Sequence, residues 1–207
     1  MPPRAPRAAL LYDSRVSGNC YKVRLLLAHL GAGYERREVD VVDRSNRLEL
    51  LGELNPGLRV PTLVFDDGSS LGESNAILWY LAQNTRYLPE DPFASAKVLQ
   101  WMFFEQYSHE PNIAVVRFWV AVAGAPVVGE AEIEARRAAG YRALDAMERE
   151  LSTRAFLVAD RYSIADIALY AYTHVAGEGG FDLSGYPAIG AWLERVAAEP
   201  GHVSITA

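Results

Sequence analysis

Hydrophobic positions follow two different patterns in the two parts of this chain. In its first part, up to residue 84, short apolar runs of strand length alternate with stretches of helical periodicity. Residues 8–12 form a short apolar run that is typical of a buried strand. From Val23 to Leu30 the apolar residues recur at helical spacing, and Gly31 then ends the pattern. The chain is therefore predicted to begin with a strand followed by a helix.

The same alternation continues through the rest of the first part. The elements expected next are a strand, a short helix, a strand, a brief hairpin partner and a helix, over residues 34–42, 44–54, 60–65, 69–71 and 74–83. Asp66-Asp67-Gly68 is the tight-turn signal that joins the hairpin. This order of strands and helices is that of the thioredoxin fold.

After a polar segment with two prolines, Pro89 and Pro92, every strongly periodic stretch is helical. These stretches cover residues 94–123, 128–151, 163–176 and 187–198. We therefore predict an α+β protein. A thioredoxin-like domain occupies residues 1–84, a linker residues 85–93, and an all-α helical bundle residues 94–207.

Composition and charge narrow the class of protein. The 207 residues carry a net charge of −6 and no basic block, which argues against nucleic acid as the main partner. The single cysteine, Cys20, excludes an intrachain disulfide and favours a reducing compartment. No apolar run approaches the roughly 18 residues of a membrane span. We expect a cytoplasmic protein that binds neither nucleic acid nor membrane.

The polar turn Ser17-Gly18-Asn19-Cys20 joins the first strand to the first helix. Free N–H groups and positive dipole character at a helix N-terminus can hold a thiolate or another anion. The spacing is that of a C-x-x-C redox motif with its nucleophilic cysteine replaced by Ser17. Thiol chemistry is still available if a cofactor brings the thiol. Ser17 could instead only cap the helix, and we expect Cys20 to be a small buried residue rather than a nucleophile.

Two further sites converge with this turn on one ligand. At Val60-Pro61, before the third strand, a cis bond would turn the Val60 backbone toward the turn, where an extended peptide could pair with it. Ser74 offers a hydroxyl and helix N–H groups to a carboxylate, while Glu73 offers a negative charge to an ammonium. A short peptide with a thiol, a backbone amide and a zwitterionic amino-acid head fits all three sites. Glutathione has these groups.

The sequence resembles the soluble glutathione S-transferases, in particular bacterial theta-, zeta- or nu-like members with an active-site serine. The resemblance rests on four segments in the family's order and spacing, at residues 11–23, 55–63, 73–81 and 160–166. It implies a thioredoxin-like domain, an all-helical second domain, a homodimer and glutathione as co-substrate. A role in detoxification follows from the same resemblance.

The resemblance also assigns site residues. Ser17 takes the position of the activating serine, and Asn19 that of an asparagine that touches the sulfur in nu-like members. Arg59, with Val60 and Pro61, would bind the peptide backbone or the glycyl carboxylate of glutathione. The γ-glutamyl group would lie at Glu73 and Ser74. Residues 43–54 lack the loop of many bacterial members, so the remaining candidate ligands there are Arg44, Asn46 and Arg47.

Aromatic side chains could form an apolar wall for a second substrate, although they serve equally well in a core. The candidates are Tyr12, Tyr107, Phe118 and Trp119. The aromatic run from Trp101 to Tyr107 is expected to be core or a dimer contact, with contact from Glu105 to glutathione across a dimer left open. His109 and Glu110 after it are expected on a helix surface.

The mechanism expected from the Ser17 turn is thiol activation. A free thiol has a pKa of about 8.5, so only a small fraction is thiolate at neutral pH. A hydrogen bond from the Ser17 hydroxyl would stabilise the thiolate and lower that pKa. We expect an enzyme that conjugates glutathione to a small hydrophobic electrophile. A glutathione-dependent disulfide or peroxide reductase and a non-catalytic binding or regulatory protein are the alternatives.

Overall fold

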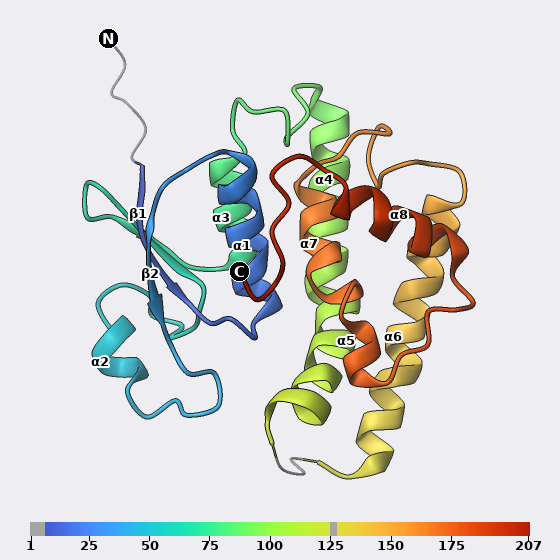
Figure 1. Ribbon diagram of the computed structural model, residues 1–207, viewed down its shortest axis with the longest axis horizontal. Helices are drawn as coiled ribbons and strands as arrows, with labels where there is room; N and C mark the ends of the chain where they lie inside the picture. The colour runs from blue at the N-terminus through green and yellow to red at the C-terminus, as the bar shows by residue number, and fades with distance from the viewer. Residues whose placement is uncertain (1–6, 125–127) are drawn as a thin grey trace. The chain divides into compact units, whose positions relative to one another are not determined.

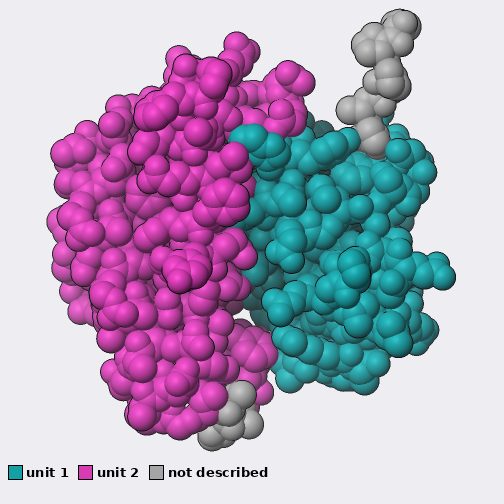
Figure 2. Space-filling view, turned by 180° about the vertical axis from the view of Figure 1, so that it is seen from behind, with its two compact units in different colours: residues 1–81, 203–207 teal, residues 82–202 magenta. Residues whose placement is uncertain are grey.

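The computed structural model describes residues 7–124 and 128–207 (Figure 1). The chain divides into two compact units, which Figure 2 colours separately. The first unit comprises the chain up to Leu81 together with Val203–Ala207, and the second comprises Ala82–His202. The last five residues therefore belong to the first unit, whereas the domain division expected from the sequence placed them in the helical domain.

The first unit is a four-stranded sheet with helices, in the strand order β2-β1-β3-β4. β1 pairs parallel with β2 and antiparallel with β3, and β3 pairs antiparallel with β4. The elements are β1 (Ala8–Asp13), α1 (Gly18–His29), β2 (Glu35–Glu38), α2 (Arg47–Leu51), β3 (Thr62–Phe65), β4 (Ser70–Leu71) and α3 (Ser74–Leu81). The thioredoxin-like first domain predicted from the sequence is thereby confirmed.

Alternation along the strands gives this sheet two apolar faces. Leu11 and Leu63 pack on one face with Val23 of α1 and Ile77 of α3. The next residue along β1, Tyr12, lies in the other core cluster, which includes residues of α2. Because successive side chains of a strand point to opposite faces, a single sheet can hold helices on both sides.

The strand register decides which loops meet at one edge of the sheet. Tyr12, near the end of β1, pairs with Thr62 at the start of β3. Leu71, at the end of β4, pairs with Leu63. The turn into α1, the segment before β3 and the segment after β4 therefore leave the sheet at the same edge. These are the three segments that carry the predicted site residues.

Strand β2 is shorter than the predicted strand over residues 34–42. Asp40 causes the early end, because its Oδ1 accepts hydrogen bonds from Val42 N at 2.7 Å and Asp43 N at 3.1 Å. An aspartate that bonds the backbone just ahead of it favours a turn over a continued strand.

The second unit is helical throughout its described elements, as the sequence predicts. They are α4 (Pro92–Phe104), a π-helical segment (Glu105–His109), α5 (Glu110–Arg117), a second π-helical segment (Phe118–Val122), α6 (Glu130–Leu151), α7 (Ile164–Thr173), a 3-10 turn (Ala176–Gly179) and α8 (Pro187–Ala197). Among the described helices, none combines the length and the apolar character needed to cross a membrane.

The π-helical segment between α4 and α5 corrects the expectation that His109 lies on a helix surface. Pro111 has no N–H for a regular helical bond, and the turn before it widens so that Glu110 N donates to Glu105 O. The extra residue rotates the helix faces. Both Glu105 and His109 are fully buried, and His109 Nε2 lies 2.9 Å from Thr173 Oγ1.

A buried carboxylate anchors α7. Asp166 Oδ2 accepts from Ser163 N (2.9 Å) and from Ser163 Oγ (3.1 Å). The first of these bonds, together with a bond from the Asp166 backbone N–H to the Ser163 side chain, forms the predicted capping box. Asp166 Oδ1 accepts from Leu157 N and from Trp192 Nε1, both at 3.0 Å. Burial raises the pKa of Asp166 to about 6, while these hydrogen bonds act to lower it. Asp166 thus connects the preceding loop, α7 and α8.

Asp166→Asn is expected to lower the free energy of unfolding by about 2–4 kcal/mol, because an amide NH2 group would face N–H donors in a buried site. Chemical denaturation measures this value. The matched control is Asp160→Asn, in an exposed loop, where the amide oxygen can still accept from Ala155 N. We expect a change below about 1 kcal/mol for the control. Equal effects of the two substitutions would contradict the anchoring role.

Candidate functional site

Ser17 is the N-cap of α1. Its Oγ accepts a hydrogen bond from Cys20 N at 3.3 Å, and its backbone N–H donates to Ser14 O at 3.1 Å. The side chain is half-buried. A hydroxyl that accepts a bond still has its own hydrogen to donate. Capping and donation to a ligand are therefore compatible roles for Ser17.

A polar cluster, the Lys22 cluster, joins the N-termini of α1 and α3. It consists of the buried Lys22 and Ser74 and the half-buried Asn19 and Asn75. Lys22 is fully buried, and its Nζ donates to Asn19 Oδ1 at 2.8 Å and to Ser74 Oγ at 3.4 Å. Ser74 Oγ in turn donates to Asn19 Oδ1 at 3.2 Å. A cation beneath two helix N-termini makes this part of the first unit favourable for an anion.

The sequence predicted Asn19 and Ser74 as site residues without predicting that they touch each other. It assigned no role to Lys22. The available signal was its spacing, because Asn19 and Lys22 lie three residues apart and so share a helix face. The burial of Lys22 depends on the packing of α1 beside α3, which no local pattern reveals.

The segment before β3 presents an unpaired stretch of backbone. The Val60–Pro61 peptide bond is cis. The N–H and C=O of Val60 make no hydrogen bond to any residue that the structure describes. Arg59 is exposed beside them. An open N–H and C=O pair is what an extended peptide needs for strand-like pairing.

Asn55 holds this segment in place. Its Nδ2 donates to Arg59 O at 3.1 Å and to Thr62 Oγ1 at 2.9 Å, while its Oδ1 accepts from Gly57 N at 2.9 Å. A Cβ at position 72 would lie only 2.6 Å from Asn55 Nδ2, so the close approach requires Gly72. Asn55 therefore links the segment before β3 to the segment before α3.

Glu73 adopts a left-handed backbone conformation with φ of +61°. This conformation costs a residue other than glycine about 1–3 kcal/mol and is concentrated at functional sites. The Glu73 side chain is exposed, whereas Ser74, which begins α3, is buried. The two predicted ligands for an amino-acid head are therefore adjacent, with the carboxylate open to solvent.

The further candidates from the sequence differ in their surroundings within each unit. Arg47 is buried and donates to Leu58 O and Asp40 O, both at 3.0 Å, so it holds the loop around α2. Burial lowers its pKa. Arg44 and Asn46 are exposed. Of the aromatic candidates, Tyr12 belongs to a core cluster, Tyr107 is 87% exposed, and Phe118 and Trp119 are half-buried.

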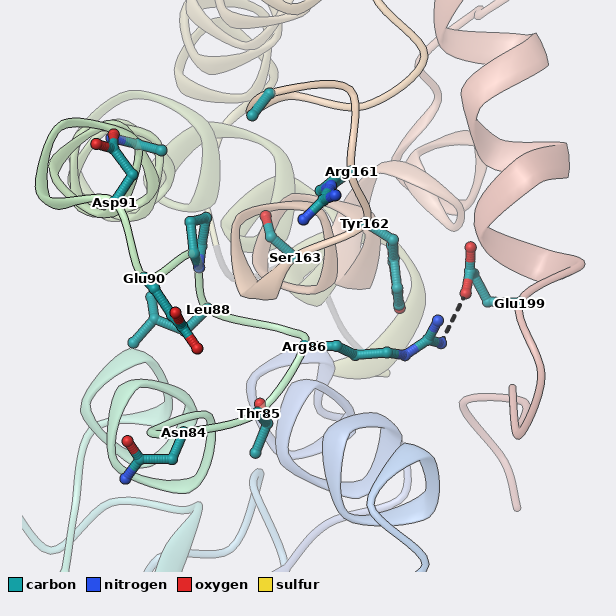
Figure 3. A pocket seen from close by; sticks show the side chains of 13 residues that line it. Asn84, Thr85, Arg86, Leu88, Glu90, Asp91, Arg161, Tyr162, Ser163 and Glu199 are labelled. Atoms are coloured by element: carbon teal, nitrogen blue, oxygen red, sulfur yellow. Dashed lines mark hydrogen bonds and ion pairs between the residues drawn. The ribbon is translucent and has the colours of Figure 1, made fainter.

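A separate hollow of about 860 Å³ lies in the second unit, between the segment before α4 and the loop before α7 (Figure 3). Arg86 extends along it and pairs with Glu199 at 3.0 Å. Arg161, Glu90 and Asp91 also line it. Its charged groups of both signs differ from the apolar wall expected for a hydrophobic electrophile, and it contains none of the predicted site residues.

Family comparisons cover both parts of the chain. A family model described as "Glutathione S-transferase, N-terminal domain" matches residues 11–89, and one described as "Glutathione S-transferase, C-terminal domain" matches residues 101–200. The chain belongs to the glutathione S-transferase family. Members of this glutathione-binding family share the fold described above, a thioredoxin-like domain followed by a helical one.

Solved structures agree with this assignment. A glutathione S-transferase from Pseudomonas fluorescens is 49% identical, with a TM-score of 0.92, over 96% of this chain and 98% of its own. A possible glutathione S-transferase from Rhodopseudomonas palustris is 45% identical, with the same TM-score and the same coverage. By sequence, the disulfide-bond oxidoreductase YfcG of Escherichia coli is 30% identical over 88% of this chain and 87% of its own. Similarity thus extends to family members with different named activities.

In this glutathione S-transferase family member, Cys20 is not a nucleophile. The residue is fully buried, and its Sγ accepts a hydrogen bond from Ser14 N at 3.3 Å. Burial, aided by the Asp13 carboxylate, raises the pKa of Cys20 to about 12, although contacts with Ser17, Ser14 and Arg24 act to lower it. The expectation of a small buried residue is confirmed, and Cys20 is a neutral thiol at physiological pH.

Cys20 is expected to resist alkylation by iodoacetamide from pH 7 to 9, because both the thiolate and access to it are lacking in the folded protein. Mass spectrometry of the native and the denatured protein measures the labelling. Rapid labelling should begin only on unfolding, and Cys20→Ala should retain any glutathione-dependent activity. Fast labelling of the native protein at pH 7 would show that the thiol is reactive after all.

Proposed function

We propose that this protein is a glutathione S-transferase that joins the thiolate of glutathione to a small hydrophobic electrophile. The observation that carries the proposal is the meeting of three polar segments at one edge of the sheet. They are the Ser17 cap, the unpaired backbone of Val60, and the start of α3 at Ser74. Each matches a different chemical group of glutathione.

In this proposal, glutathione lies extended along the segment before β3. The N–H and C=O of Val60 pair with the backbone of its cysteinyl residue, and Arg59 binds the glycyl carboxylate. Ser74 and the N–H groups that begin α3 bind the γ-glutamyl carboxylate above the Lys22 cluster. Glu73 binds the γ-glutamyl ammonium, which places the thiol toward Ser17.

Ser17 then acts as a hydrogen-bond donor to the sulfur. The bond stabilises the thiolate, and the thiol proton passes to water. Asn19, two residues after Ser17 in the same turn, is a second group near the sulfur. The thiolate attacks the electrophilic carbon, so that a C–S bond forms while the leaving group departs with its electron pair. Because Cys20 is buried and neutral, the bound glutathione supplies the only thiol in this scheme.

We propose a homodimer as the working form, located in the cytoplasm and acting in detoxification, as is typical of the family. Two large apolar side chains support a partner surface. Phe103 is 69% exposed and Tyr107, four residues later, is 87% exposed. Phe103 lies in the last turn of α4 and Tyr107 in the π-helical segment that follows, and a second copy would cover both side chains.

A second candidate function is glutathione-dependent reduction of a disulfide or peroxide. The similarity to a disulfide-bond oxidoreductase at 30% identity favours it. In that reaction, the same thiolate attacks a substrate sulfur and forms a mixed disulfide, from which a second glutathione releases the reduced product. A non-catalytic binding or regulatory protein with this fold is the third alternative, and binding of glutathione separates it from the two enzymes. Product analysis separates the first two, because an aryl halide yields a thioether and a disulfide substrate yields oxidised glutathione.

Ser17→Ala is expected to lower kcat about 10- to 100-fold and to raise the pKa of the bound glutathione thiol by about 1–2 units, since a hydrogen bond to a charged group is worth about 1.5–3 kcal/mol. Ultraviolet titration of the bound thiolate and conjugation of an aryl halide measure the two effects. Ser163→Ala is the control, because it removes another serine N-cap, that of α7 in the second unit. Ser163 Oγ also donates to the buried Asp166, so its loss should cost at least as much stability as the loss of Ser17 Oγ.

Unchanged turnover and thiolate fraction in Ser17→Ala would mean that Ser17 only caps the helix or that Asn19 suffices. If Ser163→Ala lost as much activity as Ser17→Ala, the fall in kcat would be explained by lower protein stability rather than by loss of a bond to the sulfur. If millimolar glutathione gave no thermal stabilisation of the parent protein, both enzymatic proposals would fail, since a bound ligand raises stability by mass action.

A further inference from the structure

The last five residues of the chain are held by side chains of the first unit. Three carbonyl oxygens, two residues apart in sequence, each accept a hydrogen bond. The pairs are Tyr21 Oη with Val203 O at 2.7 Å, Arg24 Nη2 with Ile205 O, and Arg36 Nη1 with Ala207 O at 2.6 Å. We name these three donors the tail clamp. Figure 1 shows the end of the chain beside α1, which carries two of them.

A buried carboxylate organises the two arginines of the tail clamp. Asp13 is fully buried at the end of β1. Its Oδ1 lies 2.5 Å from Arg24 Nη1, and its Oδ2 lies 2.6 Å from Arg36 Nη2. Each guanidinium therefore pairs with Asp13 through one nitrogen and donates a hydrogen bond to the tail from another. A fixed fork of donors suits arginine and cannot be copied by lysine.

Arg24 also reaches the turn that carries Ser17. Its Nη1 donates to Ser14 O at 3.2 Å, and its Nη2 donates to Arg15 O at 3.4 Å. Ser14 O is the same atom that accepts the backbone N–H of Ser17 at 3.1 Å. The Arg24 guanidinium and the Ser17 amide thus share one acceptor, and Arg24 is 2% exposed.

We propose that Arg24 is a positioning residue for Ser17 and that residues 203–207 complete its site. Nη2 of Arg24 has acceptors on both sides, Arg15 O in the turn and Ile205 O in the tail. Without the tail, a buried donor loses its partner and the guanidinium turns to recover one. The Ser14 carbonyl is then held less firmly, and the Ser17 hydroxyl is less well placed. The consequence for the thiol of glutathione rests on the function proposed above.

Amide hydrogen exchange in the absence of glutathione tests the positioning itself. Two variants are compared with the parent, one lacking residues 203–207 and one carrying Arg24→Lys. We expect exchange at the Ser17 and Cys20 amides to accelerate at least about ten-fold in both, with a smaller change at the amides of α3. If one of the two variants folds poorly, the other still allows the exchange rates to be compared with those of the parent.

The matched control is Arg47→Lys. It also replaces a buried guanidinium of the first unit that bridges two carbonyl oxygens, but those belong to Asp40 and Leu58. It should not selectively accelerate exchange at Ser17. Unchanged exchange at Ser17 in both test variants, or equal acceleration in Arg47→Lys, would overturn the proposal.

The catalytic consequence has a separate readout. In both test variants, the pKa of the bound glutathione thiol should rise and kcat should fall about ten-fold, with KM for glutathione less affected. A purely structural tail would lower the melting temperature and leave the thiol pKa unchanged. If the parent protein shows no lowered thiol pKa, the proposed function fails, whereas the exchange result for Arg24 and the tail stands or falls independently.

Discussion

The register of β3 against β1 is the constraint on which the rest of this structure depends. Because Tyr12 pairs with Thr62, the end of β1 lies beside the start of β3. The pairing of β3 with β4 then brings the segment before α3 to the same edge. A shift by one residue would exchange the side chains of a strand between the two cores and displace the start of β3 along the end of β1. Burial of the two cores therefore enforces the geometry of the site.

Ser17 and Cys20 stand at the two cysteine positions of a C-x-x-C motif, and neither supplies a reactive thiol. Cys20 supplies packing: it is buried and neutral, and its sulfur accepts the Ser14 amide. Ser17 supplies a hydroxyl at the helix N-terminus without a thiol of its own. An unreactive protein surface is useful where the nucleophile arrives with the ligand, because only the bound thiol is then activated.

Local signals made much of this predictable from the sequence. The capping serines and the apolar run of β1 depend on neighbours in the chain, and the structure has them where the sequence placed them. The buried position of Lys22 and the rotation that buries His109 arise from tertiary packing and from Pro111. The docking of residues 203–207 on α1 and β2 is a contact across the whole chain length. Periodicity carries no information on such contacts.

In the proposed function, the site lowers the pKa of the thiol of bound glutathione. Ultraviolet titration of glutathione bound to the unmodified protein measures this pKa. We expect a thiol pKa at least one unit below the value of about 8.5 for a free thiol. A bound thiol that titrates at the same pH as free glutathione would contradict it.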